Sequence, residues 1–420
     1  MKTAKSFDIS KHVVMEAFNK VKENRGAAGV DGESIAAFEE NLKDNLYTIW
    51  NRMSSGSYFP PPVRMVEIPK KGGGTRMLGV ASVSDRVAQT VVKMYLEPEI
   101  EPYFCEDSYG YRPGKSALDA IGKARTRCWQ YNWCIDLDIQ KFFDTIDRDL
   151  LMRAVRKHTN CPWILLYIER WLKAPLQMSN GEQRVMERGV FQGNVISPLL
   201  ANLFLHYAFD VWLKRNFPNN PYERYADDAL VHCRSYEQAE RLRQEIETRL
   251  SDCGLKLHPE KTKIVYCKDE NRQGQHQHEK FNFLGYTFRA RRMKNRNGEY
   301  FIGFGPAISN EAKKSIQQTI RHWKIHLRSD KKLEDIACML NATIHGWMNY
   351  YGEYYKSEMY PIFQHLNHIL ARWATRKYKK LRKRQRRAHH WLGRIAQREP
   401  KLFAHWKWIK PANDQTIRAV

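Results

Sequence analysis

Three aspartates have apolar rather than polar neighbours. Asp138 ends the apolar run 133–138, and Asp227 and Asp228 lie side by side directly before the apolar residues 229–231. Carboxylates held together away from water repel one another and lose hydration, and both costs favour the binding of a cation. Oxygen ligands suit Mg²⁺, which binds through a few carboxylates together with substrate phosphates. Two Mg²⁺ ions held in this way are the standard device for in-line phosphoryl transfer.

Both acidic segments are expected at the ends of strands. Residues 133–138 have the composition of a short strand, and residues 222–234 predict a hairpin with its tip at 225–228. Because side chains alternate along a strand, Asp136 shares a face with Asp138 and is a second candidate, although it also fits an ordinary hydrogen-bonded strand residue. Taken alone, an Asp-Asp pair also fits a solvated turn.

The rest of the pattern mixes helices and strands without a regular alternation. A glycine-rich break at 25–32 interrupts the helical pattern of 8–50, and strands at 63–68 and 76–80 predict a basic hairpin. Further helices are expected from near 147, at 195–215, at 237–253 and over most of 310–390, and further strands at 281–289 and 300–304. This irregular order predicts an α+β fold.

The charge balance favours a polyanionic partner. The 420 residues include 70 Lys and Arg against 46 Asp and Glu, for a formal net charge of +24, and 12% are aromatic. Basic side chains neutralise phosphates and aromatic rings stack on unpaired bases, so a nucleic-acid ligand is favoured over the alternative of a basic housekeeping enzyme. The eight cysteines include no CxxC pair, and neither a membrane helix nor a secretory signal is evident. We therefore expect a cytoplasmic protein with no membrane partner.

Positive charge is densest in residues 376–387. Nine of these twelve residues are Lys or Arg and none is acidic. Like charges at this density cost stability unless a polyanion neutralises them, which favours RNA contact over a solvated helix or a frayed tail. The RNA-binding candidates are Arg376, Lys377, Lys379, Lys380, Arg382, Lys383, Arg384, Arg386 and Arg387.

The order of several short motifs resembles that of a known family. IDLDIQKFFD at 135–144, QGNVISP at 192–198 and YADD at 225–228 are similar to the successive palm motifs of reverse transcriptases. The blocks that resemble their flanking and outlying motifs are GVDG at 29–32, DSYGYRPG at 107–114, KTK at 261–263, FLG at 283–285 and GWMNYYG at 346–352. Together they resemble the group II intron-encoded reverse transcriptase/maturase family over nearly the whole chain.

This resemblance implies a right-hand polymerase. Its expected parts are an N-terminal extension of the fingers at 1–55, fingers and palm at 56–300, and a helical thumb/maturase domain with a basic tail at 301–420. The implied activity is RNA-directed DNA synthesis from a DNA or RNA primer with dNTPs on an RNA template. Binding of group II intron RNA for splicing and retrohoming, and a bacterial-type location with nucleoid or RNA, are implied as well. The alternatives are a domesticated reverse transcriptase in DNA repair or defence, and a non-catalytic RNA-binding splicing cofactor.

The resemblance also assigns site residues. Asp138, Asp227 and Asp228 are expected to hold two Mg²⁺ ions, and Asp138 is preferred over Asp136 because an aromatic residue follows it at the family spacing. The dNTP-binding candidates are Lys70, Arg76, Phe143 and Gln192. In these roles Lys70 and Arg76 clamp the triphosphate, Gln192 contacts the sugar or the primer–template pair, and Phe143 is the steric gate against ribonucleotides.

Two features leave the shape of this pocket open. Phe142 competes with Phe143 for the steric-gate role, and both rings also fit a plain core position. Phe191 and Asn194 stand where the family has Pro and Gly, so the pocket departs from the family pattern beside Gln192.

Overall fold

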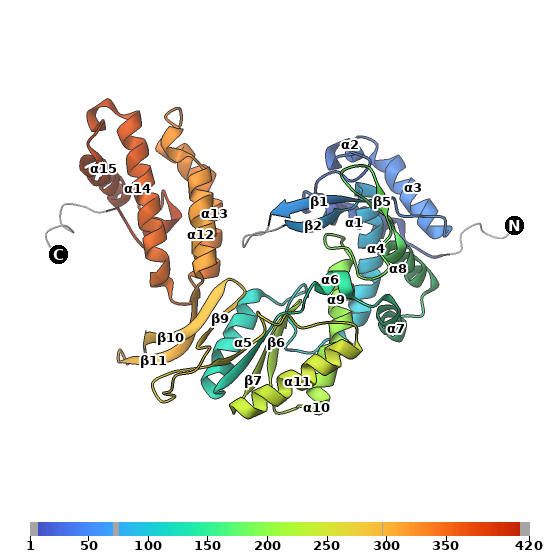
Figure 1. The fold of residues 1–420 in the computed structure, drawn as a ribbon. Helices are drawn as coiled ribbons and strands as arrows, with labels where there is room; N and C mark the ends of the chain where they lie inside the picture. The colour runs from blue at the N-terminus through green and yellow to red at the C-terminus, as the bar shows by residue number, and fades with distance from the viewer. Residues whose placement is uncertain (1–6, 70–74, 296, 412–420) are drawn as a thin grey trace. The chain divides into compact units, whose positions relative to one another are not determined.

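The computed structural model describes residues 7–69, 75–295 and 297–411, and forms two compact units, Met1–Tyr266 and Cys267–Val420 (Figure 1). Each unit has its own apolar core. Mixed helices and strands confirm the α+β prediction and fit a right-hand polymerase fold. The finer division at 55 and 300 stays a prediction about function.

The first unit begins with helices α1 (Lys11–Glu23), α2 (Ile35–Glu40) and α3 (Leu42–Ser54), followed later by the longer α4 (Val83–Ile100). Helices α1 and α3 pack on α4, and α2 packs on α3. Ser10 and Ser34 cap α1 and α2, because their hydroxyl oxygens accept backbone N–H bonds of the first turn. Between them, the glycine-rich segment is fixed by Arg64 and Arg86, which donate to the carbonyl oxygens of Ala28 and Ala27.

The expected basic hairpin is present next to these helices. Strands β1 (Val63–Pro69) and β2 (Thr75–Val80) pair antiparallel, and β4 (Leu176–Gln177) and β5 (Gln183–Arg184) extend the sheet in the order β2-β1-β4-β5.

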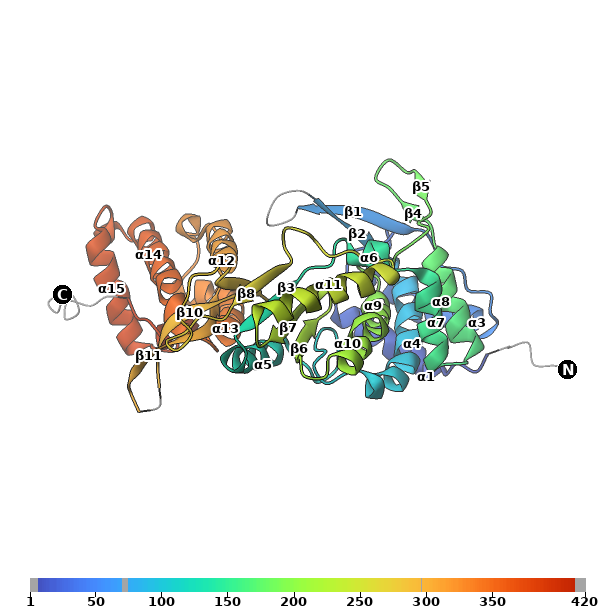
Figure 2. The ribbon, with the colours of Figure 1, turned by 60° about the horizontal axis from the view of Figure 1, so that its bottom comes forward.

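A second sheet, with the order β6-β7-β3-β8, carries the acidic segments. Its strands are β3 (Trp133–Leu137), β6 (Tyr222–Tyr225), β7 (Asp228–Cys233) and β8 (Lys263–Tyr266). Helices α5 (Ala117–Gln130) and α11 (Tyr236–Asp252) pack against it, as the turned view in Figure 2 also shows. The apolar side chains of β3 point into the core, so its acidic positions share the other face.

The prediction of a long helix over 195–215 is confirmed, with one local change of helix type. The segment runs without a break through α9 (Ser197–Leu205), a π-helical turn (His206–Asp210) and α10 (Val211–Asn216). The wider turn accompanies the buried ion pair that Asp210 makes with Arg224, a tertiary contact that local periodicity does not encode. The other helices of this unit are α6 (Phe142–Thr145), α7 (Arg148–His158) and α8 (Pro162–Lys173).

The second unit combines a three-stranded sheet with a helical bundle. A single strand over 281–289 was expected, but Leu284 and Gly285 have φ angles of +50° and +81° and form a turn, so β9 (Lys280–Phe283) and β10 (Tyr286–Lys294) are separate. Strand β11 (Tyr300–Ile308) completes the order β11-β10-β9. The helices are α12 (Asn310–His322), α13 (Leu333–Tyr351), α14 (Tyr360–Lys377) and α15 (Gln385–Arg398). Within the residues that the structure describes, no helix has the length and apolar character needed to cross a bilayer.

Candidate active site

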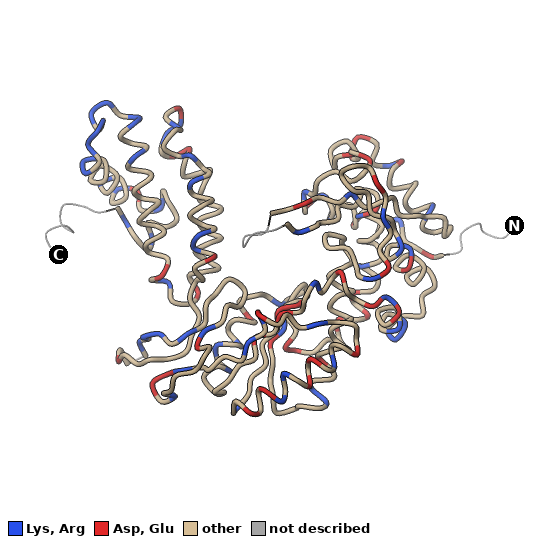
Figure 3. The backbone as a smooth tube through the Cα atoms, in the orientation of Figure 1, with Lys and Arg blue, Asp and Glu red and all other residues tan. Residues whose placement is uncertain are grey.

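Three acidic side chains meet at one end of the β6-β7-β3-β8 sheet. Strand β3 pairs with β7 so that Leu137 lies opposite Ala229, and one further residue in this register brings Asp138 opposite Asp228. Tyr225 pairs with Asp228 across the tight turn between β6 and β7, which carries Asp227. Figure 3 shows acidic positions gathered at this end of the sheet.

Protein packing and mutual repulsion disfavour the ionised forms of Asp227 and Asp228. Burial raises the pKa of Asp227, and the charge of Asp138 raises it further. Burial, followed by the charges of Asp227 and Asp138, raises the pKa of Asp228 to about 7, although this residue keeps a solvent-exposed edge. The raised pKa values mean that the fold holds these carboxylates together against their repulsion.

A fourth acid, Asp136, lies deeper on the same strand. Burial and the charges of Asp228 and Asp138 raise its pKa to about 8, while Lys263 on the paired strand lowers it. The fold therefore disfavours the ionised form of Asp136.

Lys261 gives Asp138 its cationic partner. The Lys261 ammonium lies 2.8 Å from Oδ2 of Asp138, and the next residue, Thr262, accepts the Asp138 backbone N–H through its hydroxyl at 3.4 Å. Sequence reasoning grouped Lys261 only within a family block. No spacing signal places it beside Asp138, 123 positions earlier, because a tertiary pairing brings the two segments together.

The acidic turn is held by a close backbone approach. Ala226 adopts φ +57°, and a Cβ on Gly110 would stand 2.4 Å from the Ala226 nitrogen, so only glycine fits at position 110. Asn202 donates to the carbonyl oxygen of Gly110 at 2.6 Å. Arg224 donates to the side-chain oxygen of Asn202 and to the carbonyl oxygen of Ala226, and these bonds hold the turn in place.

The predicted nucleotide-binding residues divide into two sets. Arg76 on β2 donates through Nε to Oε1 of Gln192 at 2.5 Å, and the Gly79 N–H donates to the Gln192 carbonyl oxygen at 2.7 Å. The Cβ that a residue other than glycine would add at Gly193 would stand 2.3 Å from the Gly79 oxygen, so the loop lies tightly against β2. Lys70 lies outside the described residues.

The backbone of Phe143 contacts a second loop segment, residues 189–190. Its carbonyl oxygen accepts the Val190 N–H at 2.8 Å, and Gly189, with φ +83°, approaches the same carbonyl too closely for any Cβ. The Phe143 side chain is 6% exposed and that of Phe142 is 2% exposed. Both rings therefore contribute to the core, and Phe143 keeps the larger accessible edge.

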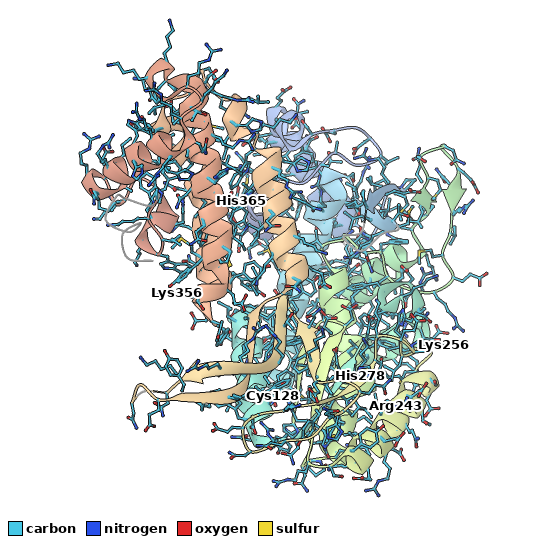
Figure 4. All side chains as sticks on the ribbon, turned by 60° about the vertical axis from the view of Figure 1, so that its left-hand side comes forward. Cys128, Arg243, Lys256, His278, Lys356 and His365 are labelled. Carbon is cyan, nitrogen blue, oxygen red and sulfur yellow. The ribbon has the colours of Figure 1, made fainter. Side chains whose placement is uncertain are left out.

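The basic segment 376–387 spans the end of α14, a short 3₁₀ turn and the start of α15. Eight of its nine Lys and Arg residues are exposed, whereas the half-buried Lys377 donates to the carbonyl oxygens of Ser329 and Lys331. In Figure 4, Lys356 lies just before α14 and His365 lies along it, so the segment occupies the far end of the helix. Trp373, before this segment, and Trp406, after it, are core residues with at most 1% exposure.

The acids suit Mg²⁺ only together with further ligands. Within residues 7–69, 75–295 and 297–411, no group of three or more His, Cys, Asp and Glu side chains is arranged to hold a metal ion unaided. Asp227 and Asp228 are nevertheless carboxylates with raised pKa values, and Asp138 is held by a lysine that a metal can replace. This donor set fits an ion that completes its coordination with substrate phosphates.

Comparison with known proteins agrees with this geometry. The family described as reverse transcriptase (RNA-dependent DNA polymerase) matches residues 68–288, and the group II intron maturase-specific domain matches residues 313–391. Protein YkfC of Escherichia coli (strain K12) is 31% identical over 309 residues, which cover 64% of this chain and 77% of YkfC.

Two longer relatives carry intron-related names. The group II intron-encoded protein LtrA of Lactococcus lactis subsp. cremoris is 30% identical over 50% of this chain and 35% of LtrA. The putative COX1/OXI3 intron 1 protein of Saccharomyces cerevisiae is 24% identical over 67% of this chain and 39% of that protein. The chain thus spans well under half of these two proteins. It belongs to the group II intron-encoded reverse transcriptase/maturase family and contains an RNA-directed DNA polymerase domain.

Proposed function

We propose that the chain extends a primer 3′-hydroxyl with dNTPs on an RNA template, with Asp138, Asp227 and Asp228 as the magnesium-binding groups. The observation that carries this proposal is the strand register that brings Asp138 opposite Asp228, next to Asp227. A protein that only binds RNA gains nothing from clustered acids beside a polyanion. The alternative of a non-catalytic splicing cofactor is therefore disfavoured.

The reaction forms a bond between the primer 3′ oxygen and the α-phosphorus of the dNTP and breaks the bond from that phosphorus to the bridging oxygen of the β-phosphate. Pyrophosphate leaves, and the hydroxyl proton passes to solvent. Two Mg²⁺ ions, when bound, supply activation of the hydroxyl and neutralisation of the phosphates. The role of the three aspartates is to hold these ions and so align primer and nucleotide.

The nucleotide pocket is proposed to lie beside the Arg76–Gln192 pair. The exposed Arg76 guanidinium is a fixed cation suited to offset negative charge on the leaving phosphates, and Lys70 is proposed to share this role. The Gln192 side-chain oxygen accepts a hydrogen bond from Arg76, and the side-chain NH₂ group is left to contact the sugar or the template pair. Phe143 is proposed to exclude the ribose 2′-hydroxyl through the edge of its ring.

The decisive experiment is primer extension on an RNA template with dNTPs, with and without Mg²⁺. We expect the Asp227→Asn/Asp228→Asn protein to lose extension by at least about 100-fold. The matched control is Asp330→Asn, at an exposed acid in the second unit, which should extend like the parent chain. Near-parental extension by the double variant, in a protein with unchanged unfolding, would refute the assignment.

A second role, binding of group II intron RNA, is proposed from the maturase-specific match and the exposed basic segment 376–387. Each phosphate contact releases counterions, so log affinity should fall linearly with log salt. Replacing Arg382, Lys383 and Arg384 with Gln should flatten that slope by roughly two to three units. A nearby control set, Lys313, Lys314 and Arg321 on α12, should leave it unchanged if the segment is the RNA surface. An unaltered slope in the variant at Arg382, Lys383 and Arg384 would mean that the RNA surface lies elsewhere.

A further inference from the structure

A buried polar network joins α4 to the loop that carries Gln192. Asp85 is 1% exposed, and Gln89, one helical turn later, is fully buried. Oδ1 of Asp85 accepts the Tyr58 hydroxyl at 2.9 Å and the Trp171 indole N–H at 2.7 Å. Its Oδ2 accepts the Gln89 side-chain N–H at 2.9 Å. A buried carboxylate therefore has three donors, all from side chains.

The other end of Gln89 reaches the loop. Its Oε1 accepts the backbone N–H of Val195 at 2.9 Å and that of Ile196 at 3.3 Å. These two amides come directly before α9, whose N-cap residue makes no side-chain capping bond. Gln89 therefore supplies from α4 an acceptor that the helix start needs but does not provide.

The direction of each hydrogen bond is fixed. The ionised Asp85 carboxylate only accepts, so the Gln89 amide must donate to it, and the amide oxygen then faces the two loop N–H groups. Rotating the amide by half a turn would place its oxygen against the carboxylate and its NH₂ against N–H donors. The network thus holds the loop in one orientation.

The loop is fixed at two places, and the proposed nucleotide pocket lies beside the first of them. At its first end, Gln192 bonds to Gly79 and Arg76 on the β2 side. At its second end, Val195 and Ile196 bond to Gln89. A shift at the second end would move Gln192 relative to Arg76, although neither Asp85 nor Gln89 contacts a nucleotide.

We propose that Asp85 and Gln89 form a positioning pair that sets the place of the Gln192 loop and thereby the affinity for the incoming dNTP. This inference rests on the proposed function of Arg76 and Gln192. The cost of keeping a carboxyl fully buried supports it: burial raises the pKa of Asp85 to about 6 even with three donors. Apolar residues would fill the same space more cheaply if packing were the only role.

A polarity swap separates positioning from packing. Asp85→Asn sets an NH₂ group against the Gln89 NH₂ group, and Gln89→Glu sets a second carboxylate against Asp85. In the double variant Asp85→Asn/Gln89→Glu, the asparagine NH₂ donates to the glutamate, whose other oxygen accepts the loop N–H groups. The double variant keeps the shape, the net charge and every donor–acceptor pair of the parent network.

We expect each single variant to raise KM for dNTP roughly tenfold with a smaller change in kcat, and the double variant to return KM to within about threefold of the parent. Amide hydrogen exchange at Val195 and Ile196 should quicken in the singles and slow again in the double. The matched control is Gln244→Glu, at an exposed glutamine on α11. If a single variant does not fold, the near-isosteric Gln89→Met should show the same rise in KM.

Three results would overturn the inference: singles that lower the melting temperature without raising KM, a double variant that is stable but keeps the raised KM, or unchanged exchange at Val195 and Ile196. Absence of polymerisation by the parent chain would instead refute the proposed function. In that case the exchange measurement still tests whether the pair positions the loop.

Discussion

Two sets of charged side chains on one sheet differ in their partners. Arg224, on β6, forms a bidentate pair with Asp210 at 2.8 and 2.5 Å, and both side chains are at most 1% exposed. On the same strand, Glu223 accepts from Arg127 at 2.6 Å and lies 2.7 Å from a nitrogen of His232. Every acid in this network has a basic partner.

The acidic turn that follows β6 has the opposite character. Asp227 and Asp228 have raised pKa values, and in the described chain the ion pair of this cluster is the one that joins Asp138 to the largely exposed Lys261. The basic residue Arg224 lies only a few positions away, but it donates to the carbonyl oxygen of Ala226 and so supports the backbone of the turn. We propose that the first set stabilises the sheet, whereas the second set is kept available for cations.

The largest expected effect comes from breaking the paired set. Asp210→Ala leaves the Arg224 guanidinium buried without its carboxylate, so the free energy of unfolding should fall by about 3–5 kcal/mol. Urea denaturation without metal measures this change. The exposed-site control, Asp330→Asn, should change the free energy by less than about 0.5 kcal/mol. A loss under about 1 kcal/mol for Asp210→Ala would show that the pair is not a stabilising element.

A smaller loss is expected at the other pair of the same network. Glu223→Gln keeps an oxygen that accepts from Arg127, and Arg127 keeps its bidentate contact with Asp107 at 2.8 and 2.9 Å. The free energy of unfolding should therefore fall by about 1–3 kcal/mol, the cost of one imperfect buried polar contact. The same denaturation series measures it. A loss as large as that of Asp210→Ala would mean that the two pairs act as one cooperative unit.

The sequence was informative where chemistry is local. Apolar neighbours and alternation singled out Asp138, Asp227 and Asp228 as candidates, and the strand patterns at 63–68 and 76–80 predicted the hairpin of β1 and β2. Features that depend on distant partners were missed. Nothing near Asp85 signals that Trp171, 86 positions later, donates to it, and nothing near Lys261 signals Asp138.

Two local changes of structure were not predicted. The helix predicted at 195–215 is present but widens into a π turn near the Asp210–Arg224 pair, and the strand predicted at 281–289 breaks at a left-handed Leu-Gly turn. Likewise, Trp373 comes shortly before the basic segment 376–387 in the sequence, yet its indole N–H donates to the Arg328 carbonyl oxygen beside the second core. Local composition does not reveal such tertiary contacts.

Asp228 of the acidic turn should respond to mutation with the opposite sign. The pKa of Asp228 is about 7 in the fold against 3.8 ordinarily, so the folded state binds this proton more tightly and loses stability as the pH rises from about 4 to 7. In chelator at pH 8, Asp228→Asn should therefore raise the free energy of unfolding by about 1–2 kcal/mol, a value reduced for solvent screening. The gain should vanish near pH 4.

Mg²⁺ provides the control for that measurement. Added Mg²⁺ should stabilise the parent chain at pH 8 and stabilise Asp228→Asn much less, because ions that bind only the folded state shift its equilibrium. Thermal unfolding at several Mg²⁺ concentrations measures both effects. Destabilisation by Asp228→Asn in chelator at pH 8 would show that this carboxylate is compensated after all, and would remove the contrast with the Arg224 network.

The smallest effect on stability is expected at Lys261, which gives one acid of the second set, Asp138, a basic partner like those of the first set. Its ion pair with Asp138 is 62% exposed on the lysine side, so Lys261→Ala should change the free energy of unfolding by less than about 1 kcal/mol. The same change removes the cation that competes for Asp138, so half-maximal thermal stabilisation should occur at a lower Mg²⁺ concentration. Lys263→Ala, on the neighbouring strand position opposite Asp136, is the matched control. A Mg²⁺ midpoint that stays put or rises in Lys261→Ala would mean that the lysine supports metal binding instead of competing with it, and that Asp138 belongs with the paired acids.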